Sequence, residues 1–303
     1  MELLTAAETI IAVLLGFASI AGYIINRFRK KGPEKSLDGL SSIASRFVYL
    51  FQTHGVHRNQ IPRFFGHDLT LADVSDDTSL LPKLTDKILD DACSLFAVRR
   101  EWLDGAEPEI YPSHHFYKHP ELFLEFIQGI NSTNPDADLY GVVVAPIEKN
   151  MHAPALLLLQ ETIGYVGDKA ISRYHLCDGW SYSYWKSRAY LTACAAMVCK
   201  HGCHIRGYHA PKREIEQLAT GETLMGWDGE GFSELGHKSW YPEDMALRPE
   251  VYLDGVDPEQ NNFGIRAALG HWLMLDMQGY MDTGLSGEHR QAFQDALDRL
   301  SSN

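Results

Sequence analysis

An apolar segment near the N-terminus, residues 9–25, constrains this chain more than any other feature. The segment holds no charged residue, and with the apolar residues before Glu8 it approaches the roughly 20 residues that a helix needs to cross a bilayer. A helix satisfies its own backbone hydrogen bonds, so a single one can cross the lipid. We therefore expect residues 1–31 to form a membrane anchor that contacts the lipid bilayer through residues 9–25.

The charges that flank this segment predict its orientation. No Lys or Arg precedes it, whereas four follow it directly: Arg27, Arg29, Lys30 and Lys31. The positive-inside rule then places the short N-terminus outside and residues 32–303 in the cytoplasm, as in a single-pass protein of a bacterial inner membrane. A cleavable signal peptide is the alternative, but its n-region would carry Glu2 and Glu8 and no basic residue.

Length, charge and cysteine content bound the remaining chain. The roughly 270 residues after the anchor exceed the usual domain of about 100 to 150 residues, so we expect two folded units. A formal net charge of −13 argues against non-specific coating of nucleic acid. Five cysteines, an odd number, do not form the framework of a secreted disulfide protein. Reduced thiols agree with a cytoplasmic location.

The first folded unit is predicted over residues 40–105, after a polar linker at 32–39. Apolar residues recur there at helical spacing, and Gly55 and Gly66 end the first two short helices. We expect a third short helix at residues 69–74 and a longer amphipathic helix at 80–98.

This unit ends in Leu95-Phe96-Ala97-Val98-Arg99-Arg100-Glu101-Trp102-Leu103-Asp104-Gly105. That ending, together with the order of the short helices, resembles the lambda-repressor or Cro-type helix-turn-helix domain over residues 43–105. The resemblance implies that Gly66 forms the turn before a recognition helix. It also implies DNA contacts from five side chains: Arg58, Arg63, Thr70, Arg99 and Arg100.

The charges near the expected recognition helix favour a different use of the same unit. Residues 45–105 hold seven Lys or Arg against nine Asp or Glu, and four carboxylates surround that helix: Asp68, Asp73, Asp76 and Asp77. Carboxylates repel phosphates, so the unit lacks the basic surface that DNA binding requires. The alternative is a helical module that binds a protein or has a structural role.

The second folded unit is predicted over residues 121–303, after a linker at 106–120. Strand-length runs of apolar residues occupy 139–146, 155–160, 170–176 and 204–208, and a further strand is possible near Leu224. Helices are expected at 121–130, 180–200, 211–219, 262–281 and 287–300. Strands and helices do not alternate regularly, so we expect an α+β fold rather than a doubly wound one. The whole chain is then α+β: an anchor, an all-α helix-turn-helix-like unit and an α+β unit.

Two segments of the second unit are candidates for ligand binding. Aromatic and cationic residues follow one another at Tyr184, Trp185, Lys186 and Arg188, where they can stack a planar ring or hold an anion. A glycine-rich loop carries Asp228 and Glu230, which can share a proton or a cation, and His237, which can act as an acid or base near neutral pH. No known catalytic motif accompanies either segment, so no catalytic residue is assigned.

The segment from Cys194 to His204 carries three cysteines and two histidines. Zinc sites are usually built from paired ligands at a tight turn, and this spacing instead crosses the end of an alanine-rich helix. Buried packing is therefore expected, with no metal and no cofactor.

These features together predict a membrane-anchored cytoplasmic regulator. In this hypothesis the helix-turn-helix-like unit binds DNA or a protein, and the α+β unit detects a small ligand or a partner. We also expect a homo-oligomer. The alternatives are an enzyme that uses Asp228, Glu230 and His237, and a structural interaction protein at the membrane.

Overall fold

The computed structural model describes residues 42–148, 153–225 and 239–301. The predicted membrane anchor lies outside these residues. Within them, no helix combines the length and the apolar character needed to cross a bilayer.

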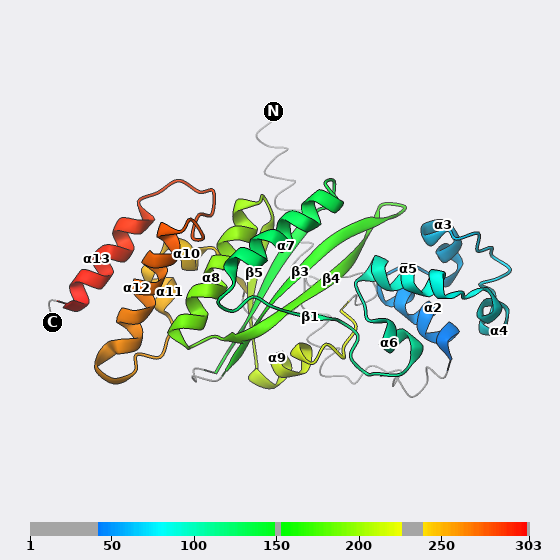
Figure 1. The fold of residues 1–303 in the computed structure, drawn as a ribbon, viewed down its shortest axis with the longest axis horizontal. Coiled ribbons are helices and arrows are strands. Elements are labelled where there is room, and N and C mark those ends of the chain that lie inside the picture. Colours follow the sequence, from blue (N-terminus) through cyan, green and yellow to red (C-terminus); the bar gives the residue numbers. More distant parts are fainter. Residues whose placement is uncertain (1–41, 149–152, 226–238, 302–303) are drawn as a thin grey trace, which may run out of the picture.

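Residues 42–105 form a set of short helices, here named the N-terminal helical unit (Figure 1). Its elements are α2 (Ile43–Thr53), η2 (Arg58–Gln60), α3 (Ile61–Phe65), α4 (Asp77–Leu80), η3 (Leu81–Lys83), α5 (Asp86–Phe96) and α6 (Arg100–Asp104). Side-chain caps begin the two longest of these helices: Ser42 forms a capping box with Ser45, and the Thr85 hydroxyl accepts from the backbone N–H of Ile88. Gly66, at a φ of 78°, ends α3 as expected.

Two predicted helices of this unit differ in the structure. The helix expected at residues 80–98 is divided into η3 and α5, because Pro82 cannot continue an α-helix and Thr85 caps a new one. Residues 69–74 form turns rather than a helix. There Thr70 and Asp73 form a reciprocal capping box, and the backbone N–H of Val74 donates to the carbonyl of Thr70, so the segment makes a single capped turn that does not continue as a helix.

The rest of the chain is built on one mixed sheet, in the order β1-β4-β3-β2-β5-β6. The strands are β1 (Ser113–His115), β2 (Leu139–Pro146), β3 (Pro154–Val166), β4 (Lys169–Ser181), β5 (His204–Ala210) and β6 (Ser239–Trp240). Strands β2, β3 and β4 form an antiparallel meander, while β5 pairs parallel with β2 and β1 pairs parallel with β4. The α+β prediction is confirmed. Strand β1 falls inside the segment predicted as a linker.

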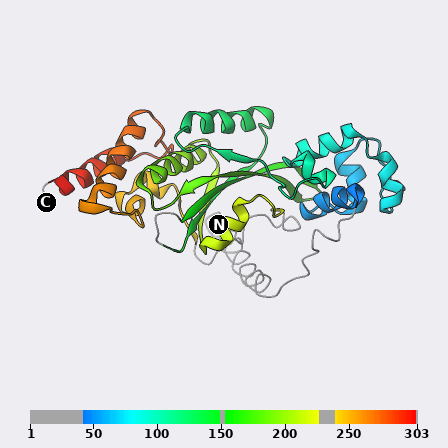
Figure 2. The same ribbon diagram turned by 60° about the horizontal axis from the view of Figure 1, so that its bottom comes forward.

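Helices cover both faces of the sheet (Figures 1 and 2). One face packs against α7 (Pro120–Thr133) and α8 (Trp185–Lys200), and the short helix α9 (Lys212–Ala219) packs against the other. Beyond α8 lie α10 (Asp244–Leu247), α11 (Pro249–Leu253), η5 (Gln260–Asn262), α12 (Phe263–Met277) and α13 (His289–Ser301). Alternation along β2 separates the two sides, because Val142 and Val144 join one core and Val143 joins the other.

The N-terminal helical unit and the sheet share a hydrophobic core. Phe51, Phe96 and Trp102 belong to the same buried cluster as Tyr174 and Leu176 of β4. The unit therefore packs on the end of the sheet, and Figure 1 shows it at one end of an elongated molecule, with α13 at the other.

Candidate functional site

Four of the five side chains predicted to contact DNA bond to carboxylates of the same chain. The guanidinium of Arg58 donates to Asp77 over 2.5 Å and to the carbonyl of Val74 over 2.7 Å. The Thr70 hydroxyl donates to Asp73 over 2.6 Å. Each of these side chains would have to exchange an existing partner for a phosphate.

The two adjacent arginines at the start of α6 form more ion pairs. Arg99 pairs with Glu101, Glu107 and Glu109. Arg100 pairs with Asp86, Asp90 and Asp104 at 2.9, 2.5 and 2.8 Å. These charge-assisted hydrogen bonds join α5, α6 and the chain that follows, so both arginines hold the helical unit together.

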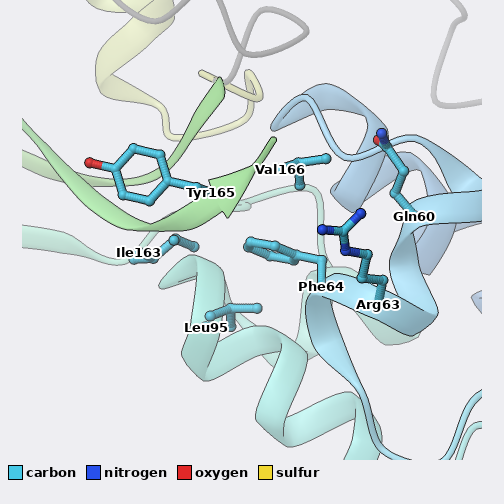
Figure 3. A pocket seen from close by; sticks show the side chains of 8 residues that line it. Gln60, Arg63, Phe64, Leu95, Ile163, Tyr165 and Val166 are labelled. Carbon is cyan, nitrogen blue, oxygen red and sulfur yellow. The ribbon is translucent and has the colours of Figure 1, made fainter. Parts of the chain in front are cut away.

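The fifth residue, Arg63, has a different environment. It lies on α3 at the rim of a hollow of about 270 Å³ between the N-terminal helical unit and the end of β3 (Figure 3). This α3–β3 hollow is lined by Gln60, Arg63, Phe64, Leu95, Ile163, Gly164, Tyr165 and Val166. The structure thus brings one predicted residue together with residues about 100 positions away in sequence, which no local pattern indicates.

The shape of the hollow depends on a close contact between α3 and β3. A Cβ atom built on Gly164 would lie 3.1 Å from Cε2 of Phe64, so the phenyl ring rests almost against the strand backbone. Figure 3 shows Phe64 and Arg63 on α3, near the end of β3, with Leu95 of α5 beside them. The hollow combines apolar side chains with one cation at its rim, so it can accept an apolar group that lies next to a negatively charged one.

The predicted ligand residues at the start of α8 separate into two groups. Arg188 is completely buried and donates to three backbone carbonyls, those of Tyr182, Tyr252 and Asp254. Its guanidinium also stacks on the ring of Tyr182, 3.6 Å from the centroid. Arg188 therefore ties α8 to the end of α11.

The other three predicted residues lie in a partly exposed aromatic cluster. The rings of Tyr184 and Trp185 are 5.4 Å apart, and Nζ of Lys186 lies 5.8 Å from the Trp185 ring. Two residues of α12 complete the cluster, since Phe263 and His271 lie edge-on to Trp185 at 6.2 and 5.8 Å. The predicted loop residues Asp228, Glu230 and His237 lie outside the described residues.

The cysteines are mostly buried. Burial raises the pKa values of the Cys177 and Cys194 thiols, so both stay protonated and inert at neutral pH. In residues 42–148, 153–225 and 239–301, no group of three or more His, Cys, Asp or Glu side chains is arranged to hold a metal ion.

A buried ionic cluster on β3 and β4 was not predicted from the sequence. The Glu161 carboxylate is completely buried and accepts from Arg173 at 2.6 and 2.7 Å, from His175 at 2.9 Å and from Asn134 at 3.1 Å. Burial alone would raise the pKa of Glu161, but these hydrogen bonds outweigh it and lower the pKa to about 2. The sequence does hold a signal for this cluster. Glu161 is the only charged residue of β3, and the next strand carries two basic residues two positions apart, Arg173 and His175.

No known protein family, curated protein or solved structure matches this chain. This α+β protein carries a helical unit whose cations are mostly paired within the chain, and a hollow where that unit meets the sheet.

Proposed function

We propose that this protein is a membrane-anchored cytoplasmic regulator whose N-terminal helical unit binds a protein partner rather than DNA. Residues 1–31 hold it at the bilayer, and the α+β part carries the helical unit and senses a ligand or a second partner. Of the two uses expected for the helix-turn-helix-like unit, DNA binding and protein binding, we propose protein binding.

The observation that carries the choice is the internal pairing of the cations. Affinity for DNA comes mainly from Lys and Arg that neutralise phosphates. Arg58, Arg99 and Arg100 each pair with at least one carboxylate of the same chain. Binding to phosphate would leave these carboxylates unpaired beside a polyanion, which is unfavourable.

The surface near the expected recognition helix supports the same choice. Leu71 and Leu81 are 65% and 49% exposed there, next to Asp73 and Asp76. The elements in this region are the four-residue α4 and the three-residue η3, which are short for an element that inserts into a major groove. The two exposed leucines offer apolar surface that a protein partner can cover, whereas the nearby carboxylates repel phosphate.

DNA binding by the full chain in lipid nanodiscs tests the choice directly. Labelled random duplex and duplex from the DNA that flanks its own coding region are titrated at low and at physiological salt. We expect no sequence-specific binding at either salt concentration. Specific, salt-sensitive binding that Arg63→Ala weakens would overturn the proposal.

Photo-crosslinking in cells tests for the protein partner. A photoreactive amino acid is placed at Leu71 or Leu81, and at the exposed Asp136, between α7 and β2, as a control site. We expect a discrete covalent adduct from the two leucine positions and none from the control. Equal labelling at all three positions would indicate random collision and would contradict a specific docking surface.

The orientation of the anchor needs its own measurement. Reporter domains that are active only in the cytoplasm or only outside it are fused to the C-terminus of the full chain. We expect activity from the cytoplasmic reporter alone, and a signal from the external reporter would remove the basis for a cytoplasmic regulator.

A further inference from the structure

Arg63 differs from every other cation of the N-terminal helical unit. Residues 42–105 hold seven Lys or Arg, and six of them bond to a carboxylate or a carbonyl: Arg46, Arg58, Lys83, Lys87, Arg99 and Arg100. Arg63 forms no hydrogen bond or ion pair with any residue that the structure describes, and its side chain is exposed. Among the Lys and Arg of this unit, Arg63 is therefore the one without a partner in the described residues, and its guanidinium can bind an external anion.

The walls behind Arg63 are apolar and incompletely covered. Phe64, Leu95, Ile163 and Val166 are all only partly buried, and Tyr165 is 58% exposed. Solvent therefore reaches apolar surface at the junction of α3, α5 and β3. Covering it would be favourable in proportion to the apolar area removed from water.

We propose that the α3–β3 hollow receives one apolar side chain from an extended segment of a partner protein, and that an Asp or Glu next to that side chain pairs with Arg63. This inference rests on the proposed protein-docking function and specifies the chemistry of the partner. The segment is acidic because the free charge at the rim is positive.

Size and residue type favour a protein segment as the occupant. A hollow of about 270 Å³ is at the lower end of small-molecule pockets and suits a single side chain. Arg and Tyr, both present at the rim, are the residue types that dominate binding energy at protein interfaces. Gln60 adds a polar group, because its oxygen accepts from the backbone N–H of His57 while its amide NH₂ can still donate.

The test uses a photoreactive peptide and the full chain in lipid nanodiscs. The probe is acetyl-Gly-Asp-X-Asp-Gly-amide, in which X is a diazirine analogue of leucine. A matched probe replaces both aspartates by lysine, and a second replaces X by alanine and serves as a competitor that lacks the apolar group. Labelled residues are identified by mass spectrometry.

We expect the aspartate probe to label residues that line the hollow, and the lysine probe to label them weakly. Arg63→Glu should lower labelling by about fivefold or more, because it places a like charge beside the aspartates of the probe. Val166→Trp should also lower it, because the indole fills the hollow without changing a charge. The control is Arg213→Glu, which reverses an exposed cation on α9 and should leave labelling unchanged.

The proposal fails if Arg63→Glu labels as strongly as the wild type, if the lysine probe labels the hollow equally well, or if the labelled residues lie elsewhere. Each variant is checked by circular dichroism, and Arg63→Glu remains decisive if Val166→Trp does not fold. Failure here, with no DNA binding, would leave the protein-docking function intact and exclude only this hollow. Specific DNA binding would instead contradict the docking function itself.

Discussion

The guanidinium of Arg173 forms a bidentate ion pair with the buried carboxylate of Glu161, with N···O distances of 2.6 and 2.7 Å. The same guanidinium donates to the carbonyl of Ser94 on α5 over 3.3 Å. One side chain of β4 therefore completes a buried charge cluster inside the sheet and also contacts the N-terminal helical unit.

Glu161→Gln is expected to destabilise the protein. The change leaves Arg173 without its counter-ion in a position that is only 20% exposed, and breaking such a pair costs about 3 kcal/mol. Urea unfolding followed by tryptophan fluorescence measures the loss. Asp86→Asn is the control, because Asp86 is 92% exposed and its pair with Arg100 contributes at most about 1 kcal/mol. A loss below about 1 kcal/mol for Glu161→Gln would contradict the importance of this cluster.

The free energy of unfolding is expected to fall in mild acid because of His54. Burial lowers its pKa from 6.5 to about 4, although the hydrogen bond to the carbonyl of Leu50 acts in the opposite direction. In this range the unfolded chain binds the proton and the folded protein does not, so the stability present above pH 6.5 falls as the pH decreases towards 4. The full effect is about 3 kcal/mol.

His54→Phe should flatten this dependence, because phenylalanine can pack against Phe96 and Tyr174 without titrating. Burial also lowers the pKa values of His114 and His271, which add slopes of the same sign. The decisive quantity is therefore the difference between wild type and His54→Phe in unfolding free energy at pH 7 and pH 5. Identical slopes for the two proteins would show that His54 takes up no proton on unfolding.

Two glycines of α12 are expected to respond in opposite directions to alanine. At Gly264 a Cβ atom would lie 2.1 Å from the carbonyl oxygen of Asp257, so Gly264→Ala must displace backbone and should cost about 1 to 3 kcal/mol. At Gly270 nothing lies within 4 Å, and Gly270→Ala should stabilise the helix by about 0.5 to 1 kcal/mol. Thermal unfolding of both variants checks the pair. A loss of similar size in both would contradict the difference in free space between the two positions, because helix propensity favours alanine at each.

Arg188→Met should loosen the attachment of α11 to α8. The change removes the donors to the carbonyls of Tyr182, Tyr252 and Asp254, and loss of the buried bond to Tyr252 alone costs about 1 to 3 kcal/mol. Hydrogen exchange should show faster exchange in α11 and the start of α12. Arg213→Met, on the exposed face of α9, is the matched control. Unchanged protection of α11 in Arg188→Met would show that these bonds do not hold the helix.

The sequence alone predicted those elements whose signal is local. The apolar run of β2 was predicted at residues 139–146, the bounds that the structure has, and the helix expected at 211–219 differs from α9 by one residue. Helix ends at Gly55 and Gly66 were also predictable, because glycine adopts a positive φ without steric cost and a residue with that φ cannot continue the helix. The α+β class followed from the order of these elements.

The tertiary structure decided what depends on residues far apart in the chain. Strand β1 has three residues, too few to show a period of two, and it exists only because β4 lies beside it. Thr70 and Asp73 cap a single turn where helical spacing predicts a helix of six residues, and the chain turns away after Val74. Two features require α3 and α5 to pack on the sheet. One is the hydrogen bond from Arg173 to the carbonyl of Ser94, and the other is the hollow that Arg63 and Val166 both line. Local periodicity shows which face of an element is apolar, but tertiary packing decides which other element covers that face. The hollow exists because α3 and α5 pack against the end of β3 and leave part of this surface uncovered.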